Sequence, residues 1–382
     1  MESEVVHKVA LWGFIGAMVF GAVANRTHFC TMGSISDWIN IGIKTRLRTW
    51  MLAMAIALVA SQIMQGLGWI DLRQSIYLTT NFAWLGYIIG GFLFGIGMTI
   101  GSGCGQRTLV RVGGGNLKSV VVLLIMGITA YMTLRGLLAY VRIEFASATS
   151  VDLSEFGITD QSIAAIIGQW FGFNRQIVLY ALTAIIGLGV TYFAFKDPAY
   201  RRDIESIMTA AVVGGLAAGA WYVTGVIGND DFEPVPLEAL SFIAPSGNTI
   251  NYLMTYTGAT INFGIAVVLG VIAGSMLYSI VTRTFRIESF ASRHDLIAHL
   301  VAGVLMGFGG VLALGCTIGQ GISGMSTLAL GSLMALLSII FGSAFTIKMQ
   351  YHLIDDSFSR AVAQTLADFR LLPKTLVAPP AN

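Results

Sequence analysis

The sequence predicts an all-α membrane protein that crosses the bilayer about nine times and contains an inverted-topology repeat. Charged residues make up 11% of its 382 residues and hydrophobic residues 55%, whereas soluble proteins carry about 25% charged residues. Nine apolar stretches have the length of a membrane span. Finally, GFLFGIGMTIGSGC (residues 91–104) recurs as GVLMGFGGVLALGC (residues 303–316), with six of the fourteen positions identical.

Apolar windows place the nine spans along the chain. They cover Val9–Ala24, Trp50–Leu67, Phe82–Ile100, Leu117–Val141, Ile177–Phe195, Ile204–Ile227, Ile261–Val281, Leu296–Leu314 and Leu328–Lys348. Half-apolar pieces too short to cross lie between them: Thr31–Ile43, Gly105–Asn116, Gln161–Phe171, Leu240–Gly258 and Thr317–Thr327. Because such pieces are tolerated at membrane depth only inside protein or beside a cavity, we expect short re-entrant helices.

The repeat has a direction. Its two copies end the third and the eighth span, and five crossings separate them, so the copies run through the membrane in opposite senses. Transporters with inverted repeats place a substrate site near the midplane. We therefore predict a first repeat over 1–145, a linking half-helix and fifth span over 146–203, a second repeat over 204–350, and a cytoplasmic tail over 351–382 that begins as an amphipathic helix.

The distribution of Lys and Arg predicts the orientation. Seventeen of these residues fall on one predicted side of the membrane and four on the other. Cytoplasmic loops carry the excess of positive charge. The N-terminus is therefore expected outside and the C-terminus in the cytoplasm, as a multi-pass protein of the bacterial inner membrane.

Three cysteines, Cys30, Cys104 and Cys316, lie in or beside apolar segments. Their odd number and wide spacing argue against a disulfide framework. A single membrane cysteine is most simply a small buried apolar residue. However, Cys104 and Cys316 occupy the same place in the two repeats, and packing alone would be served equally by Ala or Ser. A thiol offers a weak donor and a polarizable sulfur, which suit a soft, sulfur-bearing substrate.

Glycines and amides surround the paired cysteines. A Gly-rich turn that leads into a half-helix directs several backbone N–H groups at one point, so it can hold a small anion without a buried lysine. The predicted anion nest comprises Gly103, Gly105, Gln106, Gly315, Gly319 and Gln320, with electrostatic support from Arg26 and Arg111. Plainer roles stay open: glycines pack membrane helices, glutamines bond between helices, and arginines anchor cytoplasmic ends.

Four motifs give the chain a family resemblance. They are R-x-H-F-C at Arg26–Cys30, G-x-L-F-G-x-G…G-C at Gly91–Cys104, T-L-V-R-x-G-G-G-N at Thr108–Asn116 and G-C-T-I-G-Q-G at Gly315–Gly321. This pattern resembles the YeeE/YedE-like membrane proteins, which include bacterial thiosulfate-uptake transporters. The resemblance implies an hourglass-shaped path lined by Cys316, Cys104 and Cys30, from outside to inside. It also implies a cytoplasmic sulfur-carrier partner. The Gln106–Arg107 pair departs from the small residues of many relatives.

The leading hypothesis is inward passage of thiosulfate by transient thiol–sulfur hydrogen bonds, for sulfur assimilation. Alternatives are transport of another small sulfur or selenium anion, and a membrane sulfurtransferase that forms a persulfide, for which Cys30 beside Arg26 and His28 is the best nucleophile. A soft-metal permease ranks lowest because the 16 Met residues show no repeated spacing. No enzyme activity, catalytic residue, cofactor or metal is expected. The net charge of +2 indicates no nucleic-acid partner.

Overall fold

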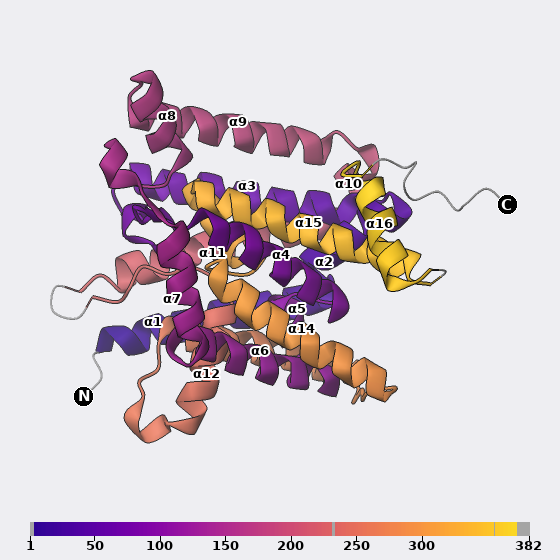
Figure 1. Cartoon of the computed structure of the whole chain (residues 1–382). Helices are drawn as coiled ribbons and strands as arrows, with labels where there is room; N and C mark the ends of the chain where they lie inside the picture. Colours follow the sequence, from indigo (N-terminus) through magenta and orange to yellow (C-terminus); the bar gives the residue numbers. More distant parts are fainter. Residues whose placement is uncertain (1–3, 231–233, 355, 373–382) are drawn as a thin grey trace.

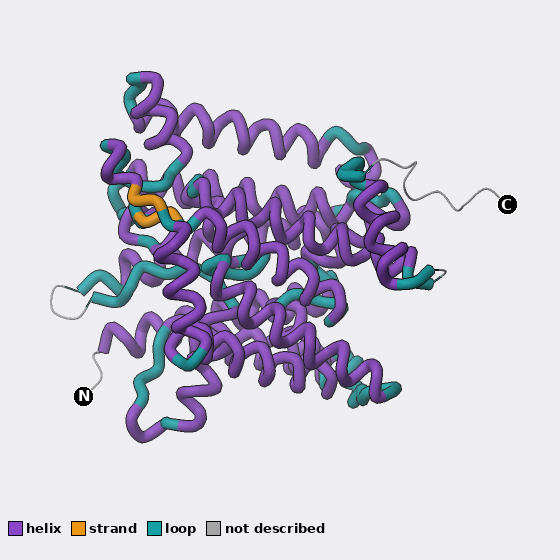
Figure 2. The backbone as a smooth tube through the Cα atoms, in the orientation of Figure 1, coloured by secondary structure: helices purple, strands orange, loops and turns teal. Residues whose placement is uncertain are grey.

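The computed structural model describes residues 4–230, 234–354 and 356–372. Most of this chain is helical (Figure 2), with one two-stranded ribbon of β1 (Asn81–Phe82) and β2 (Val151–Asp152). The predicted all-α class is therefore confirmed. The end of the tail predicted over 351–382 lies outside the described residues.

Nine helices of the described chain are long and apolar enough to cross a membrane, which confirms the predicted number of spans. They are α1 (Glu4–Arg26), α3 (Thr45–Gly66), α4 (Trp84–Ile100), α6 (Leu117–Arg135), α9 (Arg175–Phe195), α11 (Ile204–Tyr222), α13 (Phe263–Val281), α14 (Arg293–Leu312) and α15 (Leu330–His352).

Short helices fill the space between the long ones. Where the sequence predicts re-entrant pieces, the chain forms α2 (Thr31–Ser36) with the π-helix η1 (Asp37–Ile41), α5 (Gly105–Gly113), α8 (Ile163–Phe171), α12 (Ile243–Met254), and the π-helix η7 (Gly319–Gly324) with η8 (Met325–Thr327). The remaining helices are α7 (Leu138–Thr149), α10 (Pro198–Arg202), α16 (Phe358–Asp368), and the short turns η2 (Leu72–Gln74), η3 (Ile76–Leu78), η4 (Leu153–Phe156), η5 (Val223–Ile227) and η6 (Tyr256–Gly258).

The predicted fourth span, Leu117–Val141, is wrong at its end. Helix α6 stops at Arg135, Gly136 is extended, and α7 begins as a separate helix at Leu138. The Arg142 side chain explains the stop: its Nε donates to the carbonyl of Thr133 at 3.0 Å and its Nη2 to the carbonyl of Leu134 at 3.4 Å. Carbonyls that a longer helix would have used are thus satisfied by a side chain.

Helix pairings repeat across the two halves of the chain. Helix α1 packs against α13 as α11 packs against α3, and α4 packs against α15 as α14 packs against α6. The repeated glycines lie at equivalent contacts: a Cβ on Gly95 would approach the carbonyl oxygen of Ile339 to 2.3 Å, and one on Gly307 that of Met126 to 2.5 Å. These pairings agree with a repeated unit. The domain boundaries at 145, 203 and 350 stay predictions.

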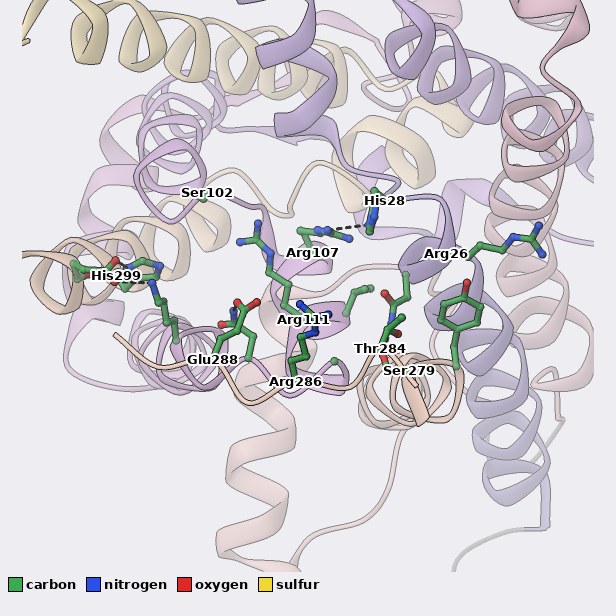
Figure 3. Close-up of a pocket in the computed structure, with 17 residues that line it drawn as sticks. Arg26, His28, Ser102, Arg107, Arg111, Ser279, Thr284, Arg286, Glu288 and His299 are labelled. Carbon is green, nitrogen blue, oxygen red and sulfur yellow. Dashed lines mark hydrogen bonds and ion pairs between the residues drawn. The ribbon is translucent and has the colours of Figure 1, made fainter. Parts of the chain in front are cut away.

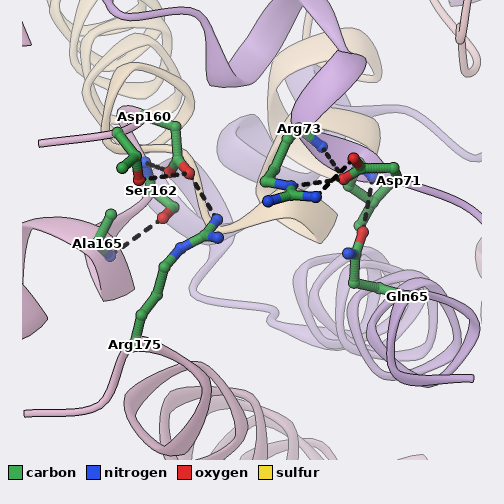
Figure 4. Close-up of polar contacts among 9 residues, drawn as sticks. Gln65, Asp71, Arg73, Asp160, Ser162, Ala165 and Arg175 are labelled. Carbon is green, nitrogen blue, oxygen red and sulfur yellow. Dashed lines mark hydrogen bonds and ion pairs between the residues drawn. The ribbon is translucent and has the colours of Figure 1, made fainter. Parts of the chain in front are cut away.

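The bundle has two distinct ends. Helices α7 and α8 and the start of α1 lie at one end, and α10 and α16 at the other (Figure 1). Helix α9 runs along the outside of the bundle and packs mainly on α3. Polar links hold the α7/α8 end together (Figure 4): Arg175 pairs with buried Asp160 at 2.6 Å, and Arg73 pairs with Asp71 at 2.8 Å.

Candidate functional site

The three cysteines share one local geometry. Each is buried, with 7%, 0% and 0% of Cys30, Cys104 and Cys316 exposed. Cys30 and Cys104 are the residues that precede α2 and α5, and Cys316 lies just before η7. Two residues before each cysteine the backbone is left-handed, at His28 (φ 53°), Ser102 (φ 55°) and Leu314 (φ 56°). A left-handed residue ends a helix, so each cysteine begins a new direction of the chain.

Helices α4 and α14 end in the same hydrogen-bonded turn. The amide of Gly103 donates to the carbonyl of Met98 at 2.8 Å, and the amide of Gly315 donates to that of Gly310 at 2.8 Å. The amide one residue earlier donates to the carbonyl three residues back, from Ser102 to Thr99 and from Leu314 to Val311, both at 3.1 Å. Both bonds of a Schellman cap are therefore present in each repeat. The sequence repeat thus extends to the backbone that positions Cys104 and Cys316.

Each thiol faces a backbone amide three residues further on. The N–H of Gly319 donates to the Cys316 sulfur at 3.4 Å. The amides of Gly33 and Arg107 face the thiols of Cys30 and Cys104 in the same way. Around Cys316 the amides of Ile318 and Phe242 also point to the sulfur. The cysteines therefore lie where backbone N–H groups converge, as the anion-nest prediction requires.

The cysteines form a connected string across the middle of the protein. The thiols of Cys30 and Cys104 are neighbours that interact electrostatically. The side chain of Thr317, next to Cys316, lies close to the Cys104 thiol. Each neighbour in the string comes from a different segment, because Cys30 follows α1, Cys104 follows α4, and Cys316 with Thr317 follows α14.

Three buried polar groups beside the cysteines lack a hydrogen-bond partner in the described structure. They are the Gln106 amide nitrogen and the hydroxyls of Thr31 and Thr317, each on a side chain no more than 3% exposed. An unsatisfied buried donor costs about 1–3 kcal/mol, and such groups are few in native proteins. These groups lie next to the thiols.

The two glutamines of the predicted nest differ. The Gln106 oxygen accepts from the Cys104 thiol at 3.8 Å, and its nitrogen is unpaired. In contrast, the Gln320 nitrogen donates to the carbonyl of Ala313 at 2.5 Å, and its oxygen accepts from the Ser332 hydroxyl at 2.6 Å. Gln320 thus fastens η7 to the end of α14 and to α15, while Gln106 keeps a free donor.

A cavity of about 630 Å³ opens toward the α10/α16 end, and we call it the Arg107 cavity (Figure 3). Basic side chains dominate its lining: Arg26, His28, Arg107, Arg111, Lys118 and Arg286. Arg107 Nη2 lies 3.2 Å from His28 Nδ1, next to the Cys30–Cys104 pair. Such a cationic cleft raises the local concentration of anions.

A second cavity, of about 270 Å³, lies on the other side of the cysteines, toward the α7/α8 end. We call it the Glu238 cavity. Its lining includes Tyr77, Ser241, Ala244, Leu314 and Gly315, so it reaches the turn that carries Cys316. Ala244 stands where the first repeat has Cys30, if SFIAPSG (241–247) is matched to THFCTMG (27–33). The two cavities approach the buried cysteines from opposite ends of the bundle.

The remaining predicted residues have mixed surroundings. Arg111 lines the Arg107 cavity. Arg26 also borders it, but its side chain is exposed and pairs with Glu205 at 2.8 Å. A Cβ on Gly105 would approach Ile243 Cδ1 to 2.9 Å, and one on Gly319 would approach Ser241 Oγ to 2.9 Å. These glycines therefore allow close packing next to the cysteines. The described residues contain no cluster of three or more His, Cys, Asp or Glu that could hold a metal.

Sequence reasoning did not single out Thr31, Thr317, Arg107 or Glu238 as site residues. Thr31 and Thr317 carried a usable signal, since Cys-Thr occurs in both FCTMG and GCTIG. Arg107 carried no such signal, because charge alone does not distinguish a loop arginine from one that lines a cavity. His28 borders the same cavity.

Comparisons with known proteins agree on one family. The sequence profile of a family described as sulphur transport matches residues 26–345. A thiosulfate transporter TsuA from Escherichia coli (strain K12) is 28% identical over 338 residues, which cover 83% of this chain and 88% of that protein. A thiosulfate transporter TsuA from Spirochaeta thermophila is 26% identical over 344 residues, which cover 87% of this chain and 97% of that protein.

Proposed function

The chain belongs to the sulphur transport family, and we propose that it takes up thiosulfate across the bacterial inner membrane through its three cysteines. The observation that carries this proposal is the arrangement of two cavities on opposite sides of a buried Cys316–Cys104–Cys30 string. The names of its two relatives support thiosulfate as the substrate.

Two kinds of contact would recognise thiosulfate at the cysteines. The terminal sulfur of the anion is soft and accepts weak S–H hydrogen bonds from Cys316, Cys104 and then Cys30. Its oxygens accept from the unpaired Gln106 amide and Thr317 hydroxyl and from the backbone amides that face the thiols. These donors replace water around the dianion, whose burial would otherwise be very costly. Because thiol contacts are weak, the anion can also leave.

The charge distribution supports inward passage from the α7/α8 end. Lys and Arg concentrate at the α10/α16 end, which the positive-inside bias assigns to the cytoplasm. In this orientation the anion would meet Cys316 first and Cys30 last. Beyond Cys30 the Arg107–His28 pair and Arg111 would draw it into the Arg107 cavity. A cytoplasmic sulfur-carrier partner stays a prediction from the family resemblance.

The test is uptake of radiolabelled thiosulfate by bacterial cells that lack their own sulfate and thiosulfate transporters. Cells with the parent chain should grow on thiosulfate as sole sulfur source. Cys104→Ala and Cys316→Ala should lose uptake while the protein remains in the membrane at the parent level. Cys→Ser variants at the same positions keep the size and replace only the sulfur. Unchanged uptake in every variant would make the cysteines packing residues, and no uptake by the parent would point to another soft anion.

A sulfurtransferase is the second candidate, because the neighbouring thiols of Cys30 and Cys104 both interact electrostatically with Arg107, which lines the basic cavity. In that reaction a Cys30 thiolate would attack the terminal sulfur, the S–S bond would break, and sulfite would leave with the bonding electrons, so that Cys30 becomes a persulfide. Mass spectrometry of the purified protein after thiosulfate addition separates the candidates. A transporter should keep three unmodified thiols, whereas a sulfurtransferase should carry one extra sulfur on Cys30.

A further inference from the structure

The two cavities have opposite charge. The Arg107 cavity is lined by more cations than carboxylates, since Arg26, Arg107, Arg111, Lys118 and Arg286 outnumber Glu288 and Asp295. Of the described residues that line the Glu238 cavity, Glu238 alone is charged, and the polar ones are neutral: Tyr77, Ser241, Asn248 and Asn262. An ionised carboxylate that lines a cavity repels an arriving dianion, because like charges a few ångströms apart raise each other's energy. The cavity on the proposed entry side is therefore unfavourable for the substrate while Glu238 is ionised.

The backbone of Glu238 is held in place beside the cavity. Its carbonyl accepts from the Thr224 hydroxyl at 2.7 Å, and its amide donates to the same oxygen at 3.2 Å. Thr224 belongs to η5 and is buried. Glu238 thus lines the cavity as a fixed part of the fold.

No cation compensates the Glu238 carboxylate within the described chain, where it takes part in no ion pair. The titratable groups on its cavity side are Tyr77 from η3, which feels both Glu238 and Cys316, and Cys316 itself. Asp230 belongs to the same connection between α11 and α12. None of these groups is a base that would hold a positive charge. Glu238 is itself exposed, so its carboxyl exchanges protons with the solution that fills the cavity.

We propose that the Glu238 cavity binds thiosulfate together with one proton, which is carried by the Glu238 carboxyl group. This inference rests on the proposed function. The proton removes the repulsion and turns the carboxyl into a hydrogen-bond donor for an oxygen of the anion. It binds from the solution that fills the cavity and returns there when the anion moves on to Cys316. No net movement of protons across the membrane is required.

Coupling between proton binding and anion binding makes the apparent affinity for the anion depend on pH. If the anion binds only with a proton, its apparent affinity falls by up to about tenfold for each pH unit above the pKa of free Glu238, the limit for one linked proton. A glutamine at this position has no charge at any pH. Its cavity should therefore bind the anion equally at all pH values.

The experiment measures initial uptake of radiolabelled thiosulfate at external pH values from about 5.5 to 8 in the transporter-deficient cells described above. Thiosulfate stays a dianion over this range. The parent chain should show an apparent KM that rises with pH by several-fold or more, and Glu238→Gln should show a flat KM. Glu155→Gln is the matched control, because Glu155 is an exposed carboxylate of η4 at the same end of the bundle. It should keep the parent's pH dependence.

Two further results decide the proposal. A flat pH profile for the parent, or a Glu238→Gln profile that still rises with pH, would overturn it while leaving thiosulfate uptake established. Absence of uptake by the parent at every pH would overturn the proposed function and this inference with it. Glu238→Asp guards against a folding defect in the glutamine variant, since it keeps a titrating group and should keep a rising KM.

Discussion

At the scale of single residues, the distinguishing feature of the site is a set of buried donors without partners. Thr317 and Gln106 follow cysteines that begin a new direction of the chain, and both side chains are fully buried. Most other buried threonines of the described chain donate to the carbonyl four residues back, as Thr346 does to Gly342 at 2.8 Å. The Thr317 hydroxyl makes no such hydrogen bond to the backbone. The hydroxyl is thus available to an anion at Cys104.

Thr317→Val is expected to reduce uptake without reducing stability. The substitution removes a donor to a charged ligand, worth about 1.5–3 kcal/mol, which corresponds to roughly a ten- to hundredfold loss of kcat/KM for thiosulfate. Since the hydroxyl's neighbour in the described protein is the Cys104 thiol, a weak acceptor, the temperature of unfolding in detergent should hardly fall. Thr346→Val is the control with a paired hydroxyl and should keep uptake. A stable Thr317→Val protein with parental uptake would remove Thr317 from the site.

At the scale of helices, close glycine contacts determine how the spans pack. Helix α1 crosses α13 so closely that a Cβ on Gly274 would lie 1.9 Å from the carbonyl oxygen of Met18, and one on Gly21 would lie 2.2 Å from that of Val271. Small residues are the usual means by which membrane helices approach. The contact also positions the end of α1, from which Cys30 follows.

Gly274→Ala is therefore expected to destabilise the protein, by about 1–3 kcal/mol or more because the helices must separate. Gly215→Ala is the matched control, since Gly215 lies within α11 and a Cβ there would meet nothing within 4 Å. Thermal unfolding in detergent should show a lower midpoint for Gly274→Ala and an unchanged or higher midpoint for Gly215→Ala, because Ala favours helix. Equal midpoints would mean that the α1–α13 crossing is looser than described.

At the scale of the whole molecule, a repeated scaffold carries an unequal distribution of charge. The pairings α1–α13 and α3–α11, and α4–α15 and α6–α14, are equivalent between the halves. The cavities are not: one is lined by several cations and the other by a single carboxylate. The cysteines are also unequal, because Cys30 corresponds to Ala244 in the second repeat. The repeated scaffold places one cavity on each side of the cysteines. The differences in charge and in cysteine content between the repeats distinguish the two ends of the bundle.

The predicted orientation can be tested with single cysteines introduced at the two ends. Glu155 and Arg201 are exposed on η4 and α10, at opposite ends of the bundle. With a membrane-impermeant maleimide, Glu155→Cys should label on intact cells, and Arg201→Cys should label only after permeabilisation. The parent chain is the background control, since its three thiols are buried. The reverse pattern would place the N-terminus in the cytoplasm.

The sequence by itself determined the class of the fold, because span length and low charge are properties of continuous segments. It also determined that Cys104 and Cys316 share one local backbone, since they recur at matched places and the Schellman caps before them depend on local residues. The predicted span Leu117–Val141 was wrong at its end. There Arg142 satisfies carbonyls at the end of α6, and a hydropathy profile does not record such a contact. Only the tertiary structure decided that Thr317 approaches Cys104 and that Arg107 and Glu238 line different cavities. It also decided that the Gln106 amide nitrogen has no hydrogen-bond partner, whereas both ends of the Gln320 amide are bonded. These are contacts between segments far apart in the chain, and each depends on how whole helices pack.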